Sequence, residues 1–241
     1  MKHFKTIALL LGFLFITGLT VAQTADQIIS NYFRNAGGKQ NWENLQTVTM
    51  HVKMNTNGME MTGTIYSKRP DRLKSVFNFM DKTIISAYDG KDAWMKNPFA
   101  PDSSAQLIPG DMAQAMKQND FEPEFLNYAG KGYTVELSGS DTVNGREVYE
   151  IKLTKKNGVI QYHYFDKESY LPVMEKEIMA SGPQKGTEGD VYFSDFRKVD
   201  GLTFPFFMES HSGGKTFQKI EISEIELNKP MDDSFFAFPD K

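Results

Sequence analysis

The chain has 241 residues, with 27 Lys and Arg against 31 Asp and Glu and a formal net charge of -4. This weakly acidic balance argues against nucleic acid or an anionic membrane surface as a partner. The absence of cysteine excludes a disulfide framework and a lipid-acceptor cysteine.

The N-terminus has the pattern of a secretory signal peptide over residues 1–22. Basic residues precede an apolar run over residues 7–16, and small residues follow up to Ala22. The run is shorter than the roughly 20 residues that a membrane-spanning helix needs. We therefore predict cleavage after Ala22, a periplasmic location and one mature domain over residues 23–241. An uncleaved N-terminal anchor is the alternative.

The mature chain begins with a predicted amphipathic helix. Thr24 and Gln27 have the spacing of a capping box. Apolar residues then recur at helical spacing until a Gly-Gly pair interrupts the pattern; they are Ile28, Ile29, Tyr32 and Phe33. We expect a short turn around Trp42 next.

Beyond Trp42 the period changes to two, which is typical of half-buried strands. The predicted strands of this half cover residues 48–54, 59–65, 73–79, 83–88 and a segment around Trp94. Asp89 and Gly90 are predicted to form a two-residue hairpin loop. We interpret the charged neighbours Lys91 and Asp92 as solvated turn residues, with a polar active site as the alternative.

The middle of the chain carries two predicted helices, over residues 111–118 and 123–129, each with apolar residues on one side. Further strands are predicted over residues 133–137, 148–153, 159–165, 173–178, 190–196, 203–209 and 216–227. A meander of about eleven strands must curl or close, because a flat sheet of that length is rare. The predicted fold class is α+β: a curved antiparallel sheet forming an incomplete β-barrel, with helices covering its concave face as a lid.

Methionine is concentrated on the alternating strands and the first mid-chain helix, at Met50, Met54, Met59, Met61, Met80, Met95, Met112 and Met116. Its unbranched, polarizable side chain forms surfaces that adapt to ligands of variable shape. The alternative is that these residues fill a core, since methionine is a common gap-filler. The predicted curved sheet and helical cover favour a cavity.

A resemblance to a known family rests on residues 65–100 and on the C-terminal segment 228–239. Its elements are Ser67-Lys68-Arg69-Pro70, the strand 73–79, the hairpin 86–91, Trp94 and Asn97-Pro98-Phe99. In order and spacing they resemble the LolA-type periplasmic lipoprotein carriers of the LolA/LppX-like half-barrel superfamily. The same half-barrel is used by lipid-binding and envelope-sensing relatives.

The resemblance implies an apolar cavity for acyl chains beneath a helical lid. The expected cavity residues are Val48, Met50, Val52, Met54, Met61, Leu73, Phe77, Phe79 and Trp94. The expected lid residues are Met112, Met116, Phe125 and Leu126. The resemblance also implies that Arg69 is the lid latch, a role that suits arginine, since its five fixed donors can fasten several lid carbonyls. The alternative for Arg69 is a solvated charge at a strand end.

No motif for catalysis or for a metal is recognised in the sequence. His51, His163 and His211 lack metal-ligand spacing, and we interpret His51 and His163 as surface or rim residues. Residues 212–216 resemble a phosphate loop but have Glu209 where its first glycine belongs. We therefore predict no catalytic residue, no metal and no cofactor.

The sequence thus predicts a soluble periplasmic carrier, not an enzyme, that shields the acyl chains of lipoproteins in a hydrophobic cavity for delivery to the outer membrane. The expected partners are acylated lipoproteins or lipids, with an inner-membrane release complex and an outer-membrane acceptor as further candidates. A monomer is expected. The alternatives are a lipid-binding sensor of envelope stress and, ranked last, a lipid-processing hydrolase.

Overall fold

A computed structural model describes residues 23–110, 113, 116, 121–178 and 188–239. In these residues a single antiparallel sheet of 13 strands accounts for most of the chain. The helices are α1 (Ala25–Asn35), α2 (Lys39–Asn44) and the short 3-10 helix η1 (Asp233–Phe235). The strands are β1 (Thr47–Thr56), β2 (Met59–Lys68), β3 (Arg72–Phe79), β4 (Lys82–Tyr88), β5 (Ala93–Lys96), β6 (Ala105–Leu107), β7 (Thr134–Val143), β8 (Arg146–Thr154), β9 (Ile160–Asp166), β10 (Pro172–Ile178), β11 (Glu188–Val199), β12 (Leu202–Ser212) and β13 (Lys215–Leu227).

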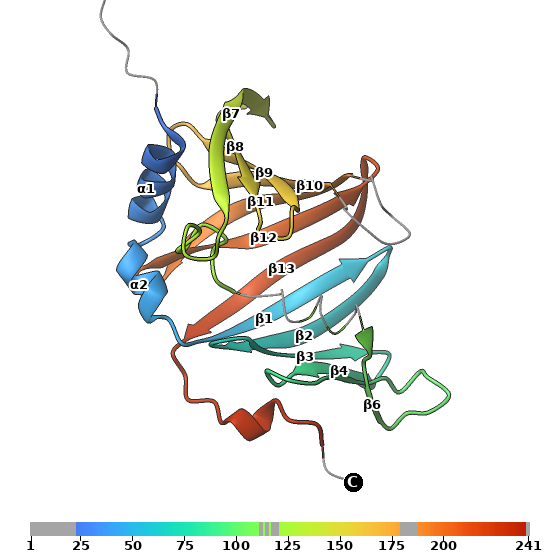
Figure 1. The fold of residues 1–241 in the computed structure, drawn as a ribbon. Helices are drawn as coiled ribbons and strands as arrows, with labels where there is room; N and C mark the ends of the chain where they lie inside the picture. Colours follow the sequence, from blue (N-terminus) through green and yellow to red (C-terminus); the bar gives the residue numbers. More distant parts are fainter. Residues whose placement is uncertain (1–22, 111–112, 114–115, 117–120, 179–187, 240–241) are drawn as a thin grey trace, which may run out of the picture.

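The first and last strands of the chain pair at the centre of the sheet. The strand order is β6-β5-β4-β3-β2-β1-β13-β12-β11-β10-β9-β8-β7, so each half of the chain is a meander that runs outward from the β1–β13 pair. The sheet curves and stays open between its edge strands β6 and β7 (Figure 1). The predicted α+β half-barrel is confirmed, although the described residues form 13 strands and not about eleven.

Helix α1 forms as its sequence predicts. The Gln27 backbone N–H donates to the Thr24 hydroxyl at 3.2 Å, and the Thr24 backbone N–H donates to Gln27 Oε1 at 2.9 Å. This capping box satisfies N–H groups that the first turn leaves without helical partners. The apolar face of α1 is buried at Ile28, Ile29, Tyr32 and Phe33.

The turn predicted around Trp42 is instead the six-residue helix α2. Trp42 is its buried residue, and the indole N–H donates to the Ala36 carbonyl at 3.0 Å. A helix this short depends on tertiary packing more than on propensity, so its apolar pattern is too brief to recognise in the sequence.

The main core lies between one face of the sheet, helices α1 and α2, and the segment 121–133. We call the face of the sheet that packs against this core the inner face; it carries Val48 and Val52 of β1. Phe125 and Leu126 of the segment belong to the same buried cluster, as do Phe165 and Phe204 of the strands. Segment 121–133 therefore covers part of the inner face, and we call residues 121–133 the cover segment.

The cover segment is not the helix that the sequence predicts over residues 123–129. It is a series of turns in which the Leu126 N–H donates to the Pro123 carbonyl at 2.8 Å and the Tyr128 N–H donates to the Phe125 carbonyl at 3.4 Å. Asn127 has φ of 51°, a left-handed conformation that a helix interior does not accept. Most of the other predicted helix, 111–118, lies outside the described residues.

The opposite face of the sheet, the outer face, is covered by the C-terminal segment 228–239. The Lys68 ammonium donates to the Met231 carbonyl at 2.6 Å, and the Lys74 ammonium donates to the Phe235 carbonyl at 2.7 Å. Phe236 is fully buried there. The C-terminal segment therefore gives this part of the sheet a second packed layer.

The loop between β4 and β5 has four residues and not the predicted two. Tyr88 pairs with Ala93, and the Asp89 carboxylate accepts from the backbone N–H groups of Lys91 and Asp92, both at 2.8 Å. The Asp89 side chain thus organises the loop itself, which supports the interpretation of these charges as turn chemistry. Over the described residues, no helix has the length and apolar character needed to cross a membrane.

Candidate functional site

A cavity of about 820 Å³ lies between the inner face of β9 to β12, the two helices and the cover segment. Its apolar wall includes Tyr32, Trp42, Met50, Phe125, Phe165, Phe193, Phe204 and Met208. The volume falls in the range of sites that enclose a small ligand, roughly 300–1,000 Å³. The aromatic and methionine lining suits an apolar ligand of flexible shape.

The strand pairing brings eight of the nine predicted cavity residues to one face. The eight share the inner face of β1, β2 and β3: Val48, Met50, Val52, Met54, Met61, Leu73, Phe77 and Phe79. Of these eight, Met50 lines the cavity. The cavity is displaced toward the other half of the sheet, because β13 and β12 lie directly beside β1.

Trp94 lies on the outer face, whereas the sequence pattern places it in the cavity. Its cross-strand partner is Ala87, which pairs in turn with Lys74, and cross-strand partners share a face. The indole N–H donates to the Phe236 carbonyl at 2.9 Å. Trp94 therefore fastens the C-terminal segment and is separated from the cavity by the sheet.

The predicted lid residues have different positions. Phe125 lines the cavity, and Leu126 is buried in the core cluster beside it. Met116 is half-buried, and Met112 lies outside the described residues. The part of the predicted lid that the structure describes is thus the cover segment.

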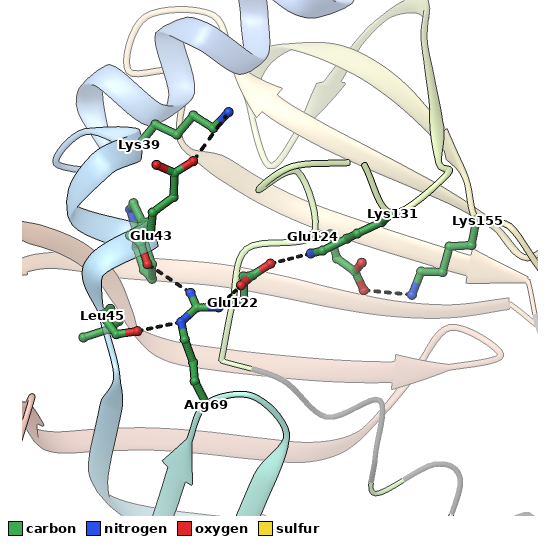
Figure 2. Close-up of polar contacts among 9 residues, drawn as sticks. Lys39, Glu43, Leu45, Arg69, Glu122, Glu124, Lys131 and Lys155 are labelled. Carbon is green, nitrogen blue, oxygen red and sulfur yellow. Dashed lines mark hydrogen bonds and ion pairs between the residues drawn. The ribbon is translucent and has the colours of Figure 1, made fainter. Parts of the chain in front are cut away.

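Arg69, the predicted latch, joins three parts of the chain (Figure 2). Its guanidinium donates to the Leu45 carbonyl at 2.6 Å, to the Trp42 carbonyl at 3.0 Å and to the carboxylate of Glu122. The carbonyls belong to the end of α2 and not to the lid. The contact with the cover segment is made through Glu122.

Glu122 also pairs with Lys131 at the other end of the cover segment, with 2.6 Å between Lys131 Nζ and Glu122 Oε1 (Figure 2). Burial alone would raise the pKa of Glu122, but hydrogen bonds from Lys131 and Arg69 outweigh it and hold the pKa below its ordinary value. Glu122 is therefore ionised and holds two cations. Arg69 also lies over the ring of Phe121, with 5.2 Å between its central carbon and the ring centroid.

A second polar group lies at β9 and β10, where His163, Glu175 and Glu177 line the cavity and Gln161 is buried beside them. The Gln161 amide donates to Glu175 and to Glu177, each at 2.8 Å. His163 is 4% exposed, so the prediction of a surface or rim residue is wrong at this position. Nearby, Lys155 pairs with Glu124 of the cover segment at 2.8 Å (Figure 2). We call Gln161, His163, Glu175 and Glu177 the acceptor cluster.

Burial shifts the titration of two members of this cluster. It raises the pKa of Glu175 to about 7, with Glu124 adding to the increase. Burial, together with the charge of Lys155, lowers the pKa of His163 to about 3. One quarter of the Glu175 side chain is accessible, and the residue lines the cavity.

The acceptor cluster has no signal in the sequence. The alternation of Gln161, His163 and Phe165 along β9 places polar and apolar residues on one face, but the sequence does not show whether that face points inward. Glu175 and Glu177 lie opposite His163 and Gln161 only through the pairing of β9 with β10. In the described residues no group of His, Asp and Glu side chains could hold a metal ion.

Residues 83–238 match a protein family described as "-like: Uncharacterized protein". The chain belongs to this family. The match begins at β4 and extends into the C-terminal segment, so it includes the cover segment and the acceptor cluster of the family member described here. Among curated proteins, none matches the sequence.

Three solved structures share the fold. A DUF1329 family protein from Desulfovibrio piger is 18% identical with a TM-score of 0.58, over 87% of this chain and 97% of its own. A putative outer membrane lipoprotein-sorting protein domain from Vibrio parahaemolyticus is 14% identical with a TM-score of 0.57, over 87% and 94%. A LolA superfamily protein from Nitrosomonas europaea is 13% identical with a TM-score of 0.57, over 90% and 98%. The fold is therefore LolA-like. Sequence identities this low show similarity of fold alone.

Proposed function

We propose that the protein is a soluble periplasmic carrier that shields acyl chains of lipoproteins or lipids for delivery to the outer membrane. The observation that carries the proposal is the cavity of about 820 Å³, which has an aromatic and methionine wall and lies beneath the cover segment. Similarity of fold to a putative lipoprotein-sorting domain adds support. In such a carrier, residues 1–22 would serve as the export signal.

The physical need for such a cavity follows from the cost of exposing hydrocarbon to water. Each exposed CH₂ group costs about 0.8 kcal/mol, so a chain of roughly sixteen carbons costs on the order of 12 kcal/mol. A non-directional apolar wall recovers much of this free energy without fixing the ligand in one pose. Met50 and Met208 give the wall that adaptability.

The cover segment controls access in this proposal. Phe121 and Phe125 line the cavity from this segment, and Glu122 ties it to Arg69 and thereby to the end of α2. Opening the cavity would separate Arg69 from Glu122, which leaves a largely buried carboxylate with one cation fewer. The ion pair therefore favours the closed arrangement and acts as the latch.

We further propose that the protein binds its ligand without converting it and acts as a monomer. A donor complex in the inner membrane and an acceptor in the outer membrane are the partners that a carrier of this kind requires. Incubation with a radiolabelled phospholipid tests the first point, since release of fatty acid or headgroup would identify the protein as a hydrolase.

The test of the carrier function is equilibrium binding of a fluorescent fatty-acyl probe to the mature protein. Met208→Trp adds an indole to the apolar wall and should abolish or weaken binding by about tenfold or more. Met59→Trp is the matched control, because Met59 is 49% exposed and lies outside the cavity lining. Circular dichroism melting confirms that both variants fold. Absence of saturable binding to the wild type, or equal binding by both variants, would refute the proposal.

A further inference from the structure

The acceptor cluster has more hydrogen-bond acceptors than donors. Both amide hydrogens of Gln161 are used, one by Glu175 and one by Glu177. Gln161 is 3% exposed, and its own Oε1 has no hydrogen-bond partner in the described part of the chain. A buried acceptor without a partner costs free energy, so its presence beside a cavity points to a donor that comes from a ligand.

His163 contributes a second acceptor of the same kind. Its Nδ1 lies 3.7 Å from Glu175 Oε2, and its Nε2 is buried with no partner among the residues the structure describes. Because burial keeps the imidazole neutral, one ring nitrogen carries the proton and the other accepts. With the proton on Nδ1, toward the carboxylate, Nε2 is the acceptor.

The charges around Glu175 leave the cluster with an excess of carboxylate. The charged groups that face Glu175 are Glu124 of the cover segment, Lys155 after β8 and Glu177 of β10, while His163 is neutral and β11 contributes the apolar Val191 opposite it. Lys155 pairs with Glu124 at 2.8 Å. In the described residues, neither Glu175 nor Glu177 forms an ion pair with a lysine or an arginine.

We propose that the acceptor cluster binds a primary ammonium group at the polar head of an amphiphile whose chain occupies the aromatic part of the cavity. An ammonium group brings three donors and a positive charge, which match the unpartnered Nε2 of His163 and the carboxylates of Glu175 and Glu177 in the cavity lining. An anionic head would meet carboxylates at the same place and is disfavoured. The inference rests on the proposed acyl-chain binding and adds the chemical class of the head group.

Displacement of a neutral fluorescent probe, N-phenyl-1-naphthylamine, tests the preference for head groups. Tetradecylamine, tetradecanol and tetradecanoate have the same chain and are compared below their micelle concentrations. The amine should displace the probe at a concentration about tenfold lower than the alcohol does, and the carboxylate should be weakest. The preference should grow between roughly pH 6 and pH 8, as Glu175 loses its proton.

Glu175→Gln keeps the size of the side chain and removes its charge, so it should bring the amine to within about twofold of the alcohol. Glu147→Gln is the matched control and should keep the preference, since the Glu147 side chain is 80% exposed and lies outside the cavity lining. If Glu175→Gln fails to fold by circular dichroism, Glu177→Gln replaces it with the same expected loss.

The outcomes separate the two proposals. Equal displacement by amine and alcohol, or an amine preference that both acceptor-cluster variants retain, overturns the ammonium site and leaves chain binding intact. If the probe binds but none of the three amphiphiles displaces it, or if the probe does not bind at all, acyl-chain binding fails and the ammonium site fails with it.

Discussion

Arg69 at the end of β2 and Glu122 in the cover segment form an ion pair across the edge of the cavity. The Glu122 side chain is 9% exposed, and the same guanidinium also holds the carbonyls of Trp42 and Leu45. One arginine thus connects strand, helix and cover. Because removal of one partner leaves the other charge buried, this contact gives the most direct prediction about the latch.

Arg69→Leu should lower the free energy of unfolding by about 3 kcal/mol and accelerate release of a bound acyl probe. Lys131 would still pair with Glu122, so the loss should stay below that of a fully isolated buried charge. Chemical denaturation and stopped-flow release measure the two effects. Arg34→Leu, on the exposed side of α1, is the control and should change neither. An unchanged release rate in Arg69→Leu would rule out the latch.

The stability of the protein should depend on pH through Glu175. Its pKa is raised from 4.5 to about 7 in the folded protein. Between these values the folded state holds a proton that the unfolded state releases, so the contribution of Glu175 to stability falls as the pH rises through this window. Glu175→Gln removes that loss. The free energy of unfolding of the variant minus that of the wild type should therefore be about 2 kcal/mol greater at pH 8 than at pH 5.

His163 has the opposite sign, because its pKa is lowered from 6.5 to about 3 and its contribution to stability is lost as the pH falls through that range. His163 is present in both the wild type and Glu175→Gln, so its contribution cancels in the difference between their melting temperatures. Thermal melts of both proteins from acid to mildly alkaline pH give that difference. A difference that does not change with pH would show that Glu175 titrates normally.

Trp94→Phe tests whether the outer face of the sheet contributes to stability without contributing to ligand binding. The change removes the indole donor of the Phe236 carbonyl and should lower the free energy of unfolding by about 1–2 kcal/mol. Acyl-probe affinity should stay within about twofold of the wild type, since Trp94 is not part of the cavity wall. Isothermal titration with the probe checks this, and a large loss of affinity would place Trp94 back in the binding site.

Gly37→Ala tests the junction between α1 and the β11–β12 turn. Gly37 has φ of +103°, and an added Cβ would lie 2.2 Å from the Gly201 carbonyl oxygen. Gly58→Ala is the matched control, with φ of +86° and open space around the added atom. Both variants carry backbone strain of about 1 kcal/mol. The clash should lower the free energy of unfolding of Gly37→Ala by about 2 kcal/mol more than that of Gly58→Ala, as measured by urea denaturation. Equal losses of stability in the two variants would show that the junction moves to accommodate the added atom.

The sequence predicts local structure well where a signal is contained within a few residues. The Thr24–Gln27 capping box predicts the start of α1, and the period of two predicts β1 with Val48, Met50 and Val52 on one face. Recognition of α2 and β6 fails because each is too short to show a period. The helix predicted in the cover segment is wrong because Asn127 has a left-handed backbone conformation, which composition does not reveal.

The candidate site is predicted less well, since its position depends on pairing between distant strands. Met50 reaches the cavity wall from β1 only because β13 and β12 lie beside that strand. The methionine pattern points to the right face but to the wrong half of the sheet; Met59 is 49% and Met80 is 73% exposed. The acceptor cluster is assembled by the register of β9 with β10, which alternation alone does not fix.

The decisive measurement for acyl-chain carriage is native mass spectrometry of the protein purified from its native cells. We expect a wild-type species that carries the mass of one acyl-chain lipid, and loss of this adduct in Met208→Trp but not in Met59→Trp. A wild type that carries no lipid and takes up none on incubation, or an adduct that persists unchanged in Met208→Trp, would contradict it.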